Sequence, residues 1–335
     1  MRTTIKDVAK AAGVHSSTVS RVINRNPNIS KETAEKVLST IKKMGYIPNI
    51  LARGLKTKKI QTIGMLIPDI ANPFFAGLAR GVEDTANIHG YNVILCNTDD
   101  LLSKEKTYIR LLEERQVEGL ILATAKIRDN IIGELEKSRF PYVLLSRNIK
   151  GIHKNSISID DIAGGYLATN YLINLGHRNI AHITGPYNTT VAQDRIKGYK
   201  KALQDFRVPF NKAYVSEGDF RIKGGYQAMK RFLRLKIPPS AVFTANDLLA
   251  FGAIEAIREN GYDVPADFSI VGFDDIRLSS YLSPPLTTIR QPILEMGSMA
   301  ISKLLERIIN RISHKNILIK PELIERKSCC RYQKS

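Results

Sequence analysis

The chain has 335 residues, 43% of them hydrophobic, and carries 50 Lys and Arg against 32 Asp and Glu, for a net charge of +18. That length predicts two or three domains, each able to bury a core of its own. No apolar run approaches the roughly 20 residues that cross a bilayer, the N-terminus lacks the apolar centre of a signal peptide, and three cysteines cannot form a disulfide framework. We therefore expect a cytoplasmic protein and exclude secreted, membrane-spanning and disordered classes.

The positive charge is concentrated at the N-terminus. Residues 1–60 hold 13 Lys and Arg against 3 Asp and Glu, which is more than half of the excess. Residues 303–335 hold a second, weaker concentration, which we interpret as a solvated basic face. The charge alone fits a nucleic acid or an anionic membrane surface. For the N-terminal segment we favour nucleic acid, because a helical pattern accompanies the charge.

Three short helices are predicted in this segment. Residues 5–12 carry apolar side chains at i, i+3, i+4 and i+7, after a cap at Thr3 or Thr4, and Gly13 can end the helix in a left-handed conformation. A second helix is expected from Ser16 or Ser17 to Asn24, and a third over residues 31–44. Two short helices with a Gly-containing turn and a bracing third helix are typical of the helix-turn-helix motif. A three-helix module without a role in DNA binding remains the alternative.

The solvent face of the second helix has the chemistry of a major-groove reader. Its short hydroxyls permit close approach to base edges, and Arg21 can donate two hydrogen bonds to a guanine. The candidate DNA-binding residues of this domain are Thr4, Ser16, Ser17, Thr18, Ser20, Arg21 and Asn24.

From about residue 60, short apolar runs alternate with amphipathic segments. The runs are TIGMLIP, YNVILCN, EGLILAT, YVLLS, NIAHITG, AVFTAN and SIVGFDD. This alternation indicates βαβ units and parallel sheets, and it contains too many units for one ordinary sheet. We therefore expect two lobes, which divide near Asp160 and again near Gln291.

Polar and aromatic residues follow these runs. They are Asp69, Asn72 to Phe75, Ser146, Arg147, Thr184, Gly185, Asp219, Phe220, Asn246, Asp247, Asp274 and Asp275. Ligands of open α/β sheets bind beyond the carboxyl ends of the strands, so these residues predict a site for a small polar ligand between the lobes. For any one of them, a structural role as a helix cap or inter-strand partner is nearly as well supported.

The segment TIKDVAKAAGVHSSTVSRVINRNPNISKETAEKVLSTIKKMGYIPNILARGL closely resembles the N-terminus of the LacI family of bacterial transcription repressors. The resemblance continues through IGMLIPDIANPFF, LGHRNIAHITG, RIKGY, ANDLLAFGAI, PADFSIVGFDD and LTTIRQP, and so spans essentially the whole chain. It implies a small all-α helix-turn-helix domain plus a hinge helix, joined to a two-lobed α/β body with periplasmic-binding-protein-like parallel sheets. The implied domains are residues 1–48, 49–59 and 60–335, with lobe one at about 60–160 and 291–322 and lobe two at about 161–290 and 323–330.

The resemblance also implies site residues. In the hinge, Leu55 would act as a minor-groove wedge between bases, with Arg53 and Lys56 beside it. Effector contacts are implied at Phe74, Ser146, Arg195, Phe220, Asn246, Asp274 and Gln291, and the strand-end position of Arg147 adds that residue. His15 stands where the family usually has Ser, and the loop at 187–192 departs from members of known effector, which leaves the ligand open.

No catalytic motif is present: the sequence has no GxGxxG after a strand, no P-loop, no GxSxG and no HExxH. We expect no enzyme, no cofactor and no metal, and we assign His177 and His182 to local hydrogen bonds.

The leading hypothesis is a homodimeric, nucleoid-associated repressor of a near-palindromic operator, modulated by a sugar or related metabolite. One alternative is a cytoplasmic solute-binding α/β protein with a vestigial basic arm. The other is a regulator controlled by a partner protein, as in catabolite-control members.

Overall fold

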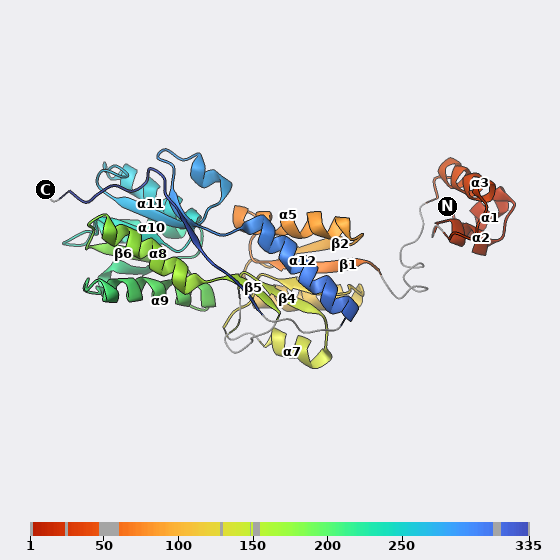
Figure 1. The fold of residues 1–335 in the computed structure, drawn as a ribbon, viewed down its shortest axis with the longest axis horizontal. Coiled ribbons are helices and arrows are strands. Elements are labelled where there is room, and N and C mark those ends of the chain that lie inside the picture. Colours follow the sequence, from red (N-terminus) through yellow and green to blue (C-terminus); the bar gives the residue numbers. More distant parts are fainter. Residues whose placement is uncertain are drawn as a thin grey trace. The chain divides into compact units, whose positions relative to one another are not determined.

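The structure is a computed structural model that describes residues 3–23, 26–46, 60–127, 130–147, 149, 155–310 and 316–333. The chain divides into two compact units, Met1–Ile60 and Gln61–Ser335. Each unit is described by itself (Figure 1).

The described residues of the first unit form three helices around one small core: α1 (Ile5–Ala12), α2 (Ser16–Ile23) and α3 (Lys31–Lys43). Thr4 and Asp7 form a reciprocal capping box at the start of α1, and Gly13 ends it with a φ of 65°. Val8, Ala12, Val19 and Val37 are fully buried between the helices. The three predicted helices are therefore present, with Met44 as the cap of α3 instead of its last residue.

The second unit consists of two lobes, each built on a six-stranded sheet. The sheet of lobe one has the order β11-β5-β4-β3-β1-β2, and every pairing in it is parallel. Its strands are β1 (Thr62–Ile67), β2 (Asn92–Asn97), β3 (Leu120–Leu122), β4 (Tyr142–Leu145), β5 (Ser156–Ile159) and β11 (Ile317–Ile319). The flanking helices are α5 (Pro73–Ile88), α6 (Leu102–Glu114), α7 (Ile131–Ser138) and α12 (Ile293–Asn310).

The sheet of lobe two has the order β12-β10-β9-β8-β6-β7, and only its edge strand β12 is antiparallel to its neighbour. Its strands are β6 (Ile180–Thr184), β7 (Val215–Glu217), β8 (Ala241–Thr244), β9 (Ser269–Asp274), β10 (Thr287–Arg290) and β12 (Glu322–Ile324). Its helices are α8 (Asp161–Asn174), α9 (Thr190–Asp205), α10 (Ile222–Leu233) and α11 (Asp247–Glu259), with 3₁₀ turns at Lys212–Tyr214 and Arg277–Ser280.

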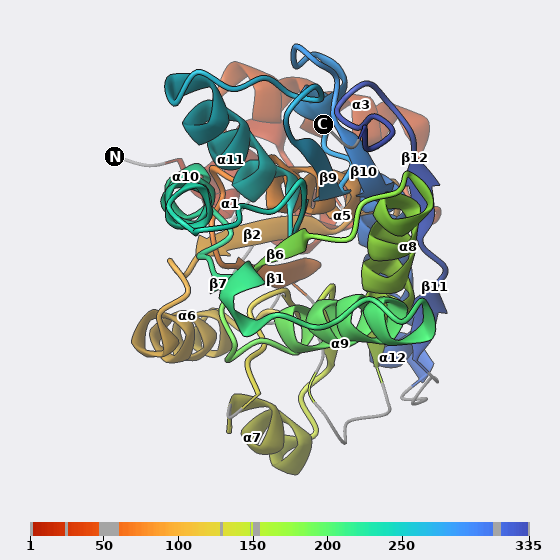
Figure 2. The same ribbon diagram turned by 90° about the vertical axis from the view of Figure 1, so that its left-hand side faces the viewer.

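Alternate residues of each central strand supply the cores on the two faces of its sheet. In β8, Val242 packs in the cluster with α10 and α11, whereas Phe243 packs in the cluster with α8 and α9. Figure 2 shows these two helix pairs on either side of the strands of lobe two. Because both faces are covered, the central strands are continuous apolar runs, and this is why the sequence revealed them.

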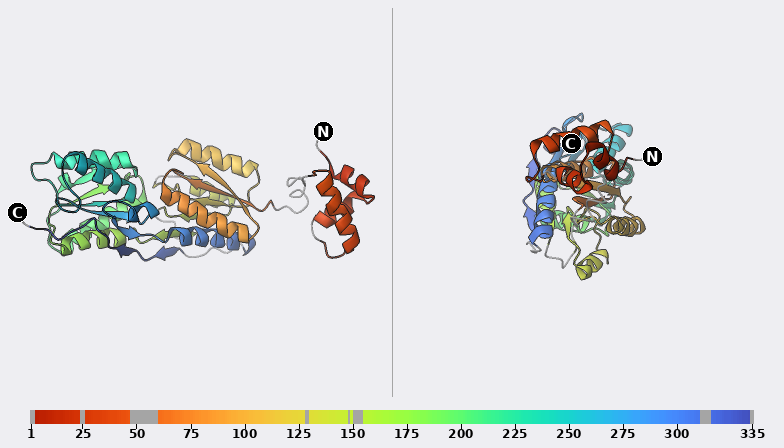
Figure 3. Two further views of the ribbon diagram at one scale, coloured as in Figure 1. Left: turned by 90° about the horizontal axis from the view of Figure 1, so that it is seen from above. Right: turned by 90° about the vertical axis from the view of Figure 1, so that its right-hand side faces the viewer.

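The chain passes between the lobes three times: after β5, after β10 and after β11. The left panel of Figure 3 shows the last of these segments running beside both lobes. The two-lobed parallel architecture matches the expected fold. The strands β5, β7, β10, β11 and β12 were not among the predicted runs. Polar residues interrupt the apolar pattern of β5, β7, β10 and β12, and β11 is an apolar stretch of only three residues.

Glycines let the paired helices of lobe two approach closely. A Cβ on Gly165 of α8 would lie 2.3 Å from the backbone oxygen of Arg195 on α9, and a Cβ on Gly198 would lie 2.1 Å from the oxygen of Ile162. Because Gly165 lets the backbone of Arg195 lie directly against α8, helix packing positions a residue of the predicted site.

We expect Gly165→Ala to lower the melting temperature of the protein by about 2–10 °C, since overpacking costs roughly 1–3 kcal/mol. Gly133→Ala in α7 is the matched control, because a Cβ there meets no atom within 4 Å. The control should be neutral or stabilising by up to about 1 kcal/mol. Thermal melts followed by circular dichroism measure both variants, and equal melting temperatures would contradict the close-packing argument.

Candidate functional site

The outer face of α2 presents the residues that the sequence marked for DNA contact. Ser17 and Arg21 lie one turn apart and are exposed, whereas Val19 and Val22 are buried beneath them. Ser16, Thr18 and Ser20 are partly exposed. Small hydroxyls around one guanidinium leave room for a base edge to approach Arg21.

Two hydroxyls among the predicted DNA-binding residues, those of Ser17 and Thr4, already have partners within the domain. His15 Nδ1 lies 2.9 Å from Ser17 Oγ, a contact that the sequence did not suggest although both residues were noted. Beside the two backbone bonds of the capping box, Thr4 Oγ1 donates to the Asp7 carboxylate at 2.7 Å, and the hydrogen bonds from Thr4 lower the pKa of Asp7. Thr4 is therefore a structural cap, and its contact with DNA stays a prediction. The structure does not describe four of the predicted DNA-binding residues: Asn24, Arg53, Leu55 and Lys56. Their roles stay predictions.

A small cavity lies between the two lobes of the second unit. All eight predicted effector residues line it, and most lining residues lie at or just after the carboxyl end of a strand. The lining is Asn72, Phe74, Phe75, Ser146, Arg147, Val191, Arg195, Phe220, Asn246, Asp274 and Gln291. Asn72 and Phe75 belong to the strand-end set, whereas Val191 was not predicted, because an apolar side chain at the start of α9 carries no chemical signal.

Each lobe contributes one buried arginine to this cavity, held in a similar way. In lobe two, Arg195 Nε donates to Asp161 at 2.8 Å, an Nη donates to the carbonyl of Ala245, and the guanidinium lies 3.5 Å from the centre of the Phe273 ring. Burial raises the pKa of Asp161 to about 6, although Arg195 opposes the shift.

In lobe one, Arg147 donates two hydrogen bonds to Asp100, at 2.7 and 3.3 Å, and lies 5.9 Å from the centre of the Phe75 ring. Burial alone would raise the pKa of Asp100, but attraction to Arg147 and the hydrogen bond from it, together with Lys126, bring that pKa below its usual value. Both arginines are thus fixed before any ligand arrives.

Asp274 and Gln291 place acceptor groups side by side in the lining. Gln291 Nε2 donates to Asp274 Oδ1 at 2.7 Å, and Gln291 Oε1 is buried without a hydrogen-bond partner among the described residues. Burial raises the pKa of Asp274 well above its usual value, against the attraction of Arg195, and the carboxylate of Asp247 raises it further. A buried acceptor without a donor is costly, so the cavity favours a ligand that donates there.

Asn246 lines the cavity but uses its side chain structurally. Its oxygen accepts the backbone N–H of Leu249 and caps α11, and its Nδ2 donates to the carbonyl of Phe220 at 3.1 Å. Phe220 has a φ of 61°, and its ring lies against Gly185, where any Cβ would overlap it. Asn246 and Gly185 therefore position an aromatic wall.

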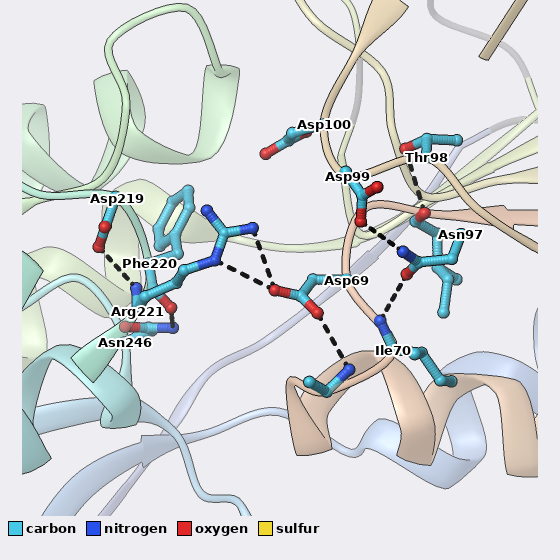
Figure 4. A network of polar contacts seen from close by, with 12 residues as sticks. Asp69, Ile70, Asn97, Thr98, Asp99, Asp100, Asp219, Phe220, Arg221 and Asn246 are labelled. Carbon is cyan, nitrogen blue, oxygen red and sulfur yellow. Dashed lines mark hydrogen bonds and ion pairs between the residues drawn. The ribbon is translucent and has the colours of Figure 1, made fainter. Parts of the chain in front are cut away.

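An ion pair joins the lobes beside the cavity. Arg221 of lobe two approaches Asp69 of lobe one at 3.1 Å, and the backbone N–H of Arg221 donates to Asp219 (Figure 4). Elsewhere between the lobes, the N–H of Ile127 donates to the carbonyl of Asn188 at 3.0 Å. Because Arg221 directly follows Phe220, the ion pair and the aromatic wall belong to one segment.

Sequence reasoning missed the buried carboxylates that organise the site. Asp100 and Asp161 were not singled out, and Asp247, which was, does not line the cavity. Asp247 accepts hydrogen bonds from Ile276, Ser279 and Thr288, and burial raises its pKa. All three aspartates come soon after a strand, which is the signal that could have identified them.

The two histidines of lobe two have local partners. His177 contacts the hydroxyls of Ser240 and Ser269, and His182 contacts the carbonyl of Phe243. In the part of the chain that the structure describes, no cluster of His, Cys, Asp and Glu could hold a metal ion. No helix among the same residues is long and apolar enough to span a bilayer.

We expect Asp274→Asn to stabilise the protein at alkaline pH. The wild-type carboxyl is hard to ionise in the folded state because its pKa is raised, so wild-type stability rises as pH falls. Asn carries no charge and keeps an oxygen for Gln291. The variant should melt about 2–4 °C higher than wild type at pH 8, and the difference should shrink toward pH 5.

Thermal melts of the full chain across this pH range measure the effect. Asp263→Asn, which changes an exposed carboxyl in the same lobe, is the control and should show no such trend. A variant that melts lower than wild type at both pH values would show that Arg195 makes the charged form of Asp274 net favourable.

Comparison with known proteins gives both units the same assignment. Residues 4–49 match the bacterial regulatory proteins of the lacI family, and residues 169–329 match a periplasmic binding protein-like domain. Over 331 residues the chain is 41% identical to HTH-type transcriptional regulator RegA of Clostridium saccharobutylicum, covering 98% of this chain and 99% of that protein. It is also 41% identical over 332 residues to HTH-type transcriptional repressor PurR of Haemophilus influenzae (strain PittEE), covering 97% and 98%.

Among solved structures, the lac repressor dimer bound to operator and the anti-inducer ONPF matches with a TM-score of 0.89 at 31% identity. That match covers 98% of this chain and 100% of that one. The helical unit, the two-lobed body and the identity over almost the full length of both relatives agree. The chain belongs to the LacI family of bacterial regulatory proteins.

Proposed function

We propose that this protein is an effector-responsive transcription repressor that acts as a homodimer on a near-palindromic operator in the bacterial nucleoid. Base contacts come from Ser16, Ser17 and Arg21 on α2, and cationic side chains of the first unit hold the phosphate backbone. A twofold protein repeats its contacts on each half-site, which is why the operator is expected to be near-palindromic.

The effector is proposed to bind in the cavity between the lobes, without being chemically transformed. The observation that carries this part is the unpaired Oε1 of Gln291 beside Asp274, because it requires a donor that the described protein residues do not supply. The lining combines aromatic rings with separate amide, carboxyl and guanidinium groups, which favours a small polar metabolite such as a monosaccharide.

The effector controls DNA binding if it binds one arrangement of the two lobes more tightly than the other. An effector that binds one arrangement tenfold more tightly changes operator affinity by about 1.4 kcal/mol. RegA and PurR are equally similar to this chain and carry different names, so identity does not choose the effector.

The test is selection of bound duplexes from a random pool at about 0.15 M salt, with and without a library of neutral sugars and nucleosides. We expect recovery of a near-palindromic site and at least one compound that changes its retention. A pool that stays random while the body binds a solute would overturn the repressor assignment and favour a solute-binding protein.

Arg21→Ala should weaken binding to the selected site by roughly 1–3 kcal/mol, or about 5- to 150-fold, and relax the preference at one base pair of each half-site. Lys43→Ala, which removes an exposed cation at the end of α3, is the control and should reduce binding to all sequences equally. Binding isotherms on the selected and a scrambled duplex separate the two effects. Equal losses on both duplexes for Arg21→Ala would place base readout elsewhere.

A further inference from the structure

The charged groups of the cavity are balanced before any ligand enters. Its lining contains two cations, Arg147 and Arg195, and one carboxyl group, Asp274. Each arginine has a carboxylate partner behind the lining: Asp100 for Arg147 and Asp161 for Arg195. The cavity therefore presents no uncompensated positive charge, although two guanidinium groups line it.

The Arg147 pair is the one whose geometry controls this balance. Asp100 follows β2 with a φ of 60°, and its two carboxylate oxygens receive separate Nη donors of Arg147. One of these nitrogens also reaches the carbonyl of Thr124, so the protein itself provides the fork-on-carboxylate contact by which arginine binds anions. Only 4% of the Arg147 side chain is exposed, whereas 30% of Asp100 is.

The other charges around Asp100 have their own partners. Lys126 donates to the backbone carbonyl of Asp100 and lies 3.7 Å from its carboxylate. Arg221, which also acts on Asp100 at longer range, is paired with Asp69. An anionic ligand would have to lose its hydration, displace Asp100 from Arg147 and lie near Asp274 as well, and an ion buried without a partner is strongly disfavoured.

We propose that Asp100 is a specificity-determining residue that, by neutralising Arg147, excludes phosphorylated and carboxylated metabolites and restricts the cavity to neutral ligands with hydrogen-bond donors. The inference rests on the proposed effector site and deepens it. Arg147 then acts as a rigid hydrogen-bond donor whose charge Asp100 compensates, beside the Phe75 ring, and the ligand's own donors meet Asp274 and Gln291.

The matched variants are Asp100→Asn and Asp99→Asn. Both remove one carboxylate from consecutive residues with a positive φ, a conformation that Asn tolerates well, so charge and backbone effects are equal. Asp99 instead pairs with Lys104 and Asn97 and is 46% exposed in its side chain. Asp100→Asn frees the guanidinium of Arg147, whereas Asp99→Asn does not.

Isothermal titration of the full chain with inorganic phosphate and with ribose 5-phosphate tests the proposal. We expect Asp100→Asn to bind both at least about tenfold more tightly than wild type and Asp99→Asn do. The double variant Asp100→Asn/Arg147→Gln should lose the gain, which would assign it to the guanidinium. Equal affinity of Asp100→Asn and Asp99→Asn for both anions would overturn the proposal.

A measurement on the wild-type chain keeps the proposal falsifiable even if Asp100→Asn fails to fold. Thermal shifts with ribose and glucose are compared with those of ribose 5-phosphate and glucose 6-phosphate. Stabilisation by a phosphorylated sugar that exceeds that of its neutral parent would overturn the proposal. Neither titration uses DNA, so a failure of operator control by the effector remains distinguishable from a failure of Asp100 to select against anions.

Discussion

The second unit depends on holding two guanidinium groups in its interior without leaving their charge unpaired. Removing an arginine from water costs several kcal/mol unless a carboxylate and further acceptors meet it. The chain meets that demand twice, with Asp161 and the carbonyl of Ala245 for Arg195, and with Asp100 and the carbonyl of Thr124 for Arg147. Close packing of α9 on α8 at Gly165 and the left-handed turn at Asp100 bring these partners together.

In the resulting site, the buried arginines are paired, whereas the buried carboxylates remain unfavourable in their charged form. Positive charge is fully compensated, whereas Asp161, Asp247 and Asp274 are buried near one another, and burial raises the pKa of each. Such clustering of shifted groups is typical of functional sites, since a protein selected only for stability would replace them. A ligand that donates hydrogen bonds to Asp274 and Gln291 lowers the free-energy cost of burying these acceptors. The binding free energy gained in this way is available to favour one lobe arrangement.

The sequence predicted much of this architecture because both faces of each sheet are covered. Fully buried strands such as β3 and β4 are unbroken apolar runs. The rule that parallel strands point their carboxyl ends at a ligand located six of the eight named effector residues, whereas Arg195 and Gln291 came from the family resemblance. Short strands such as β5 and β10 lack that signal. The partners were also out of reach: Asp100 and Arg147 are 47 residues apart, and only the folded sheet brings them together. Asn246 illustrates a further limit, because the sequence gives the residue but not whether its amide is used by ligand or by protein.

The ion pair between Arg221 and Asp69 has a consequence for how long a ligand stays. Most side chains around the cavity are buried, so we expect parting of the lobes to ease the exit of a bound molecule. Half of the Arg221 side chain is exposed, at 52%, which leaves this contact open to screening by dissolved ions. We therefore expect the residence time of a ligand to depend on ionic strength through a contact outside the cavity lining. A change in the salt content of the cell is then expected to alter how quickly a bound effector is released.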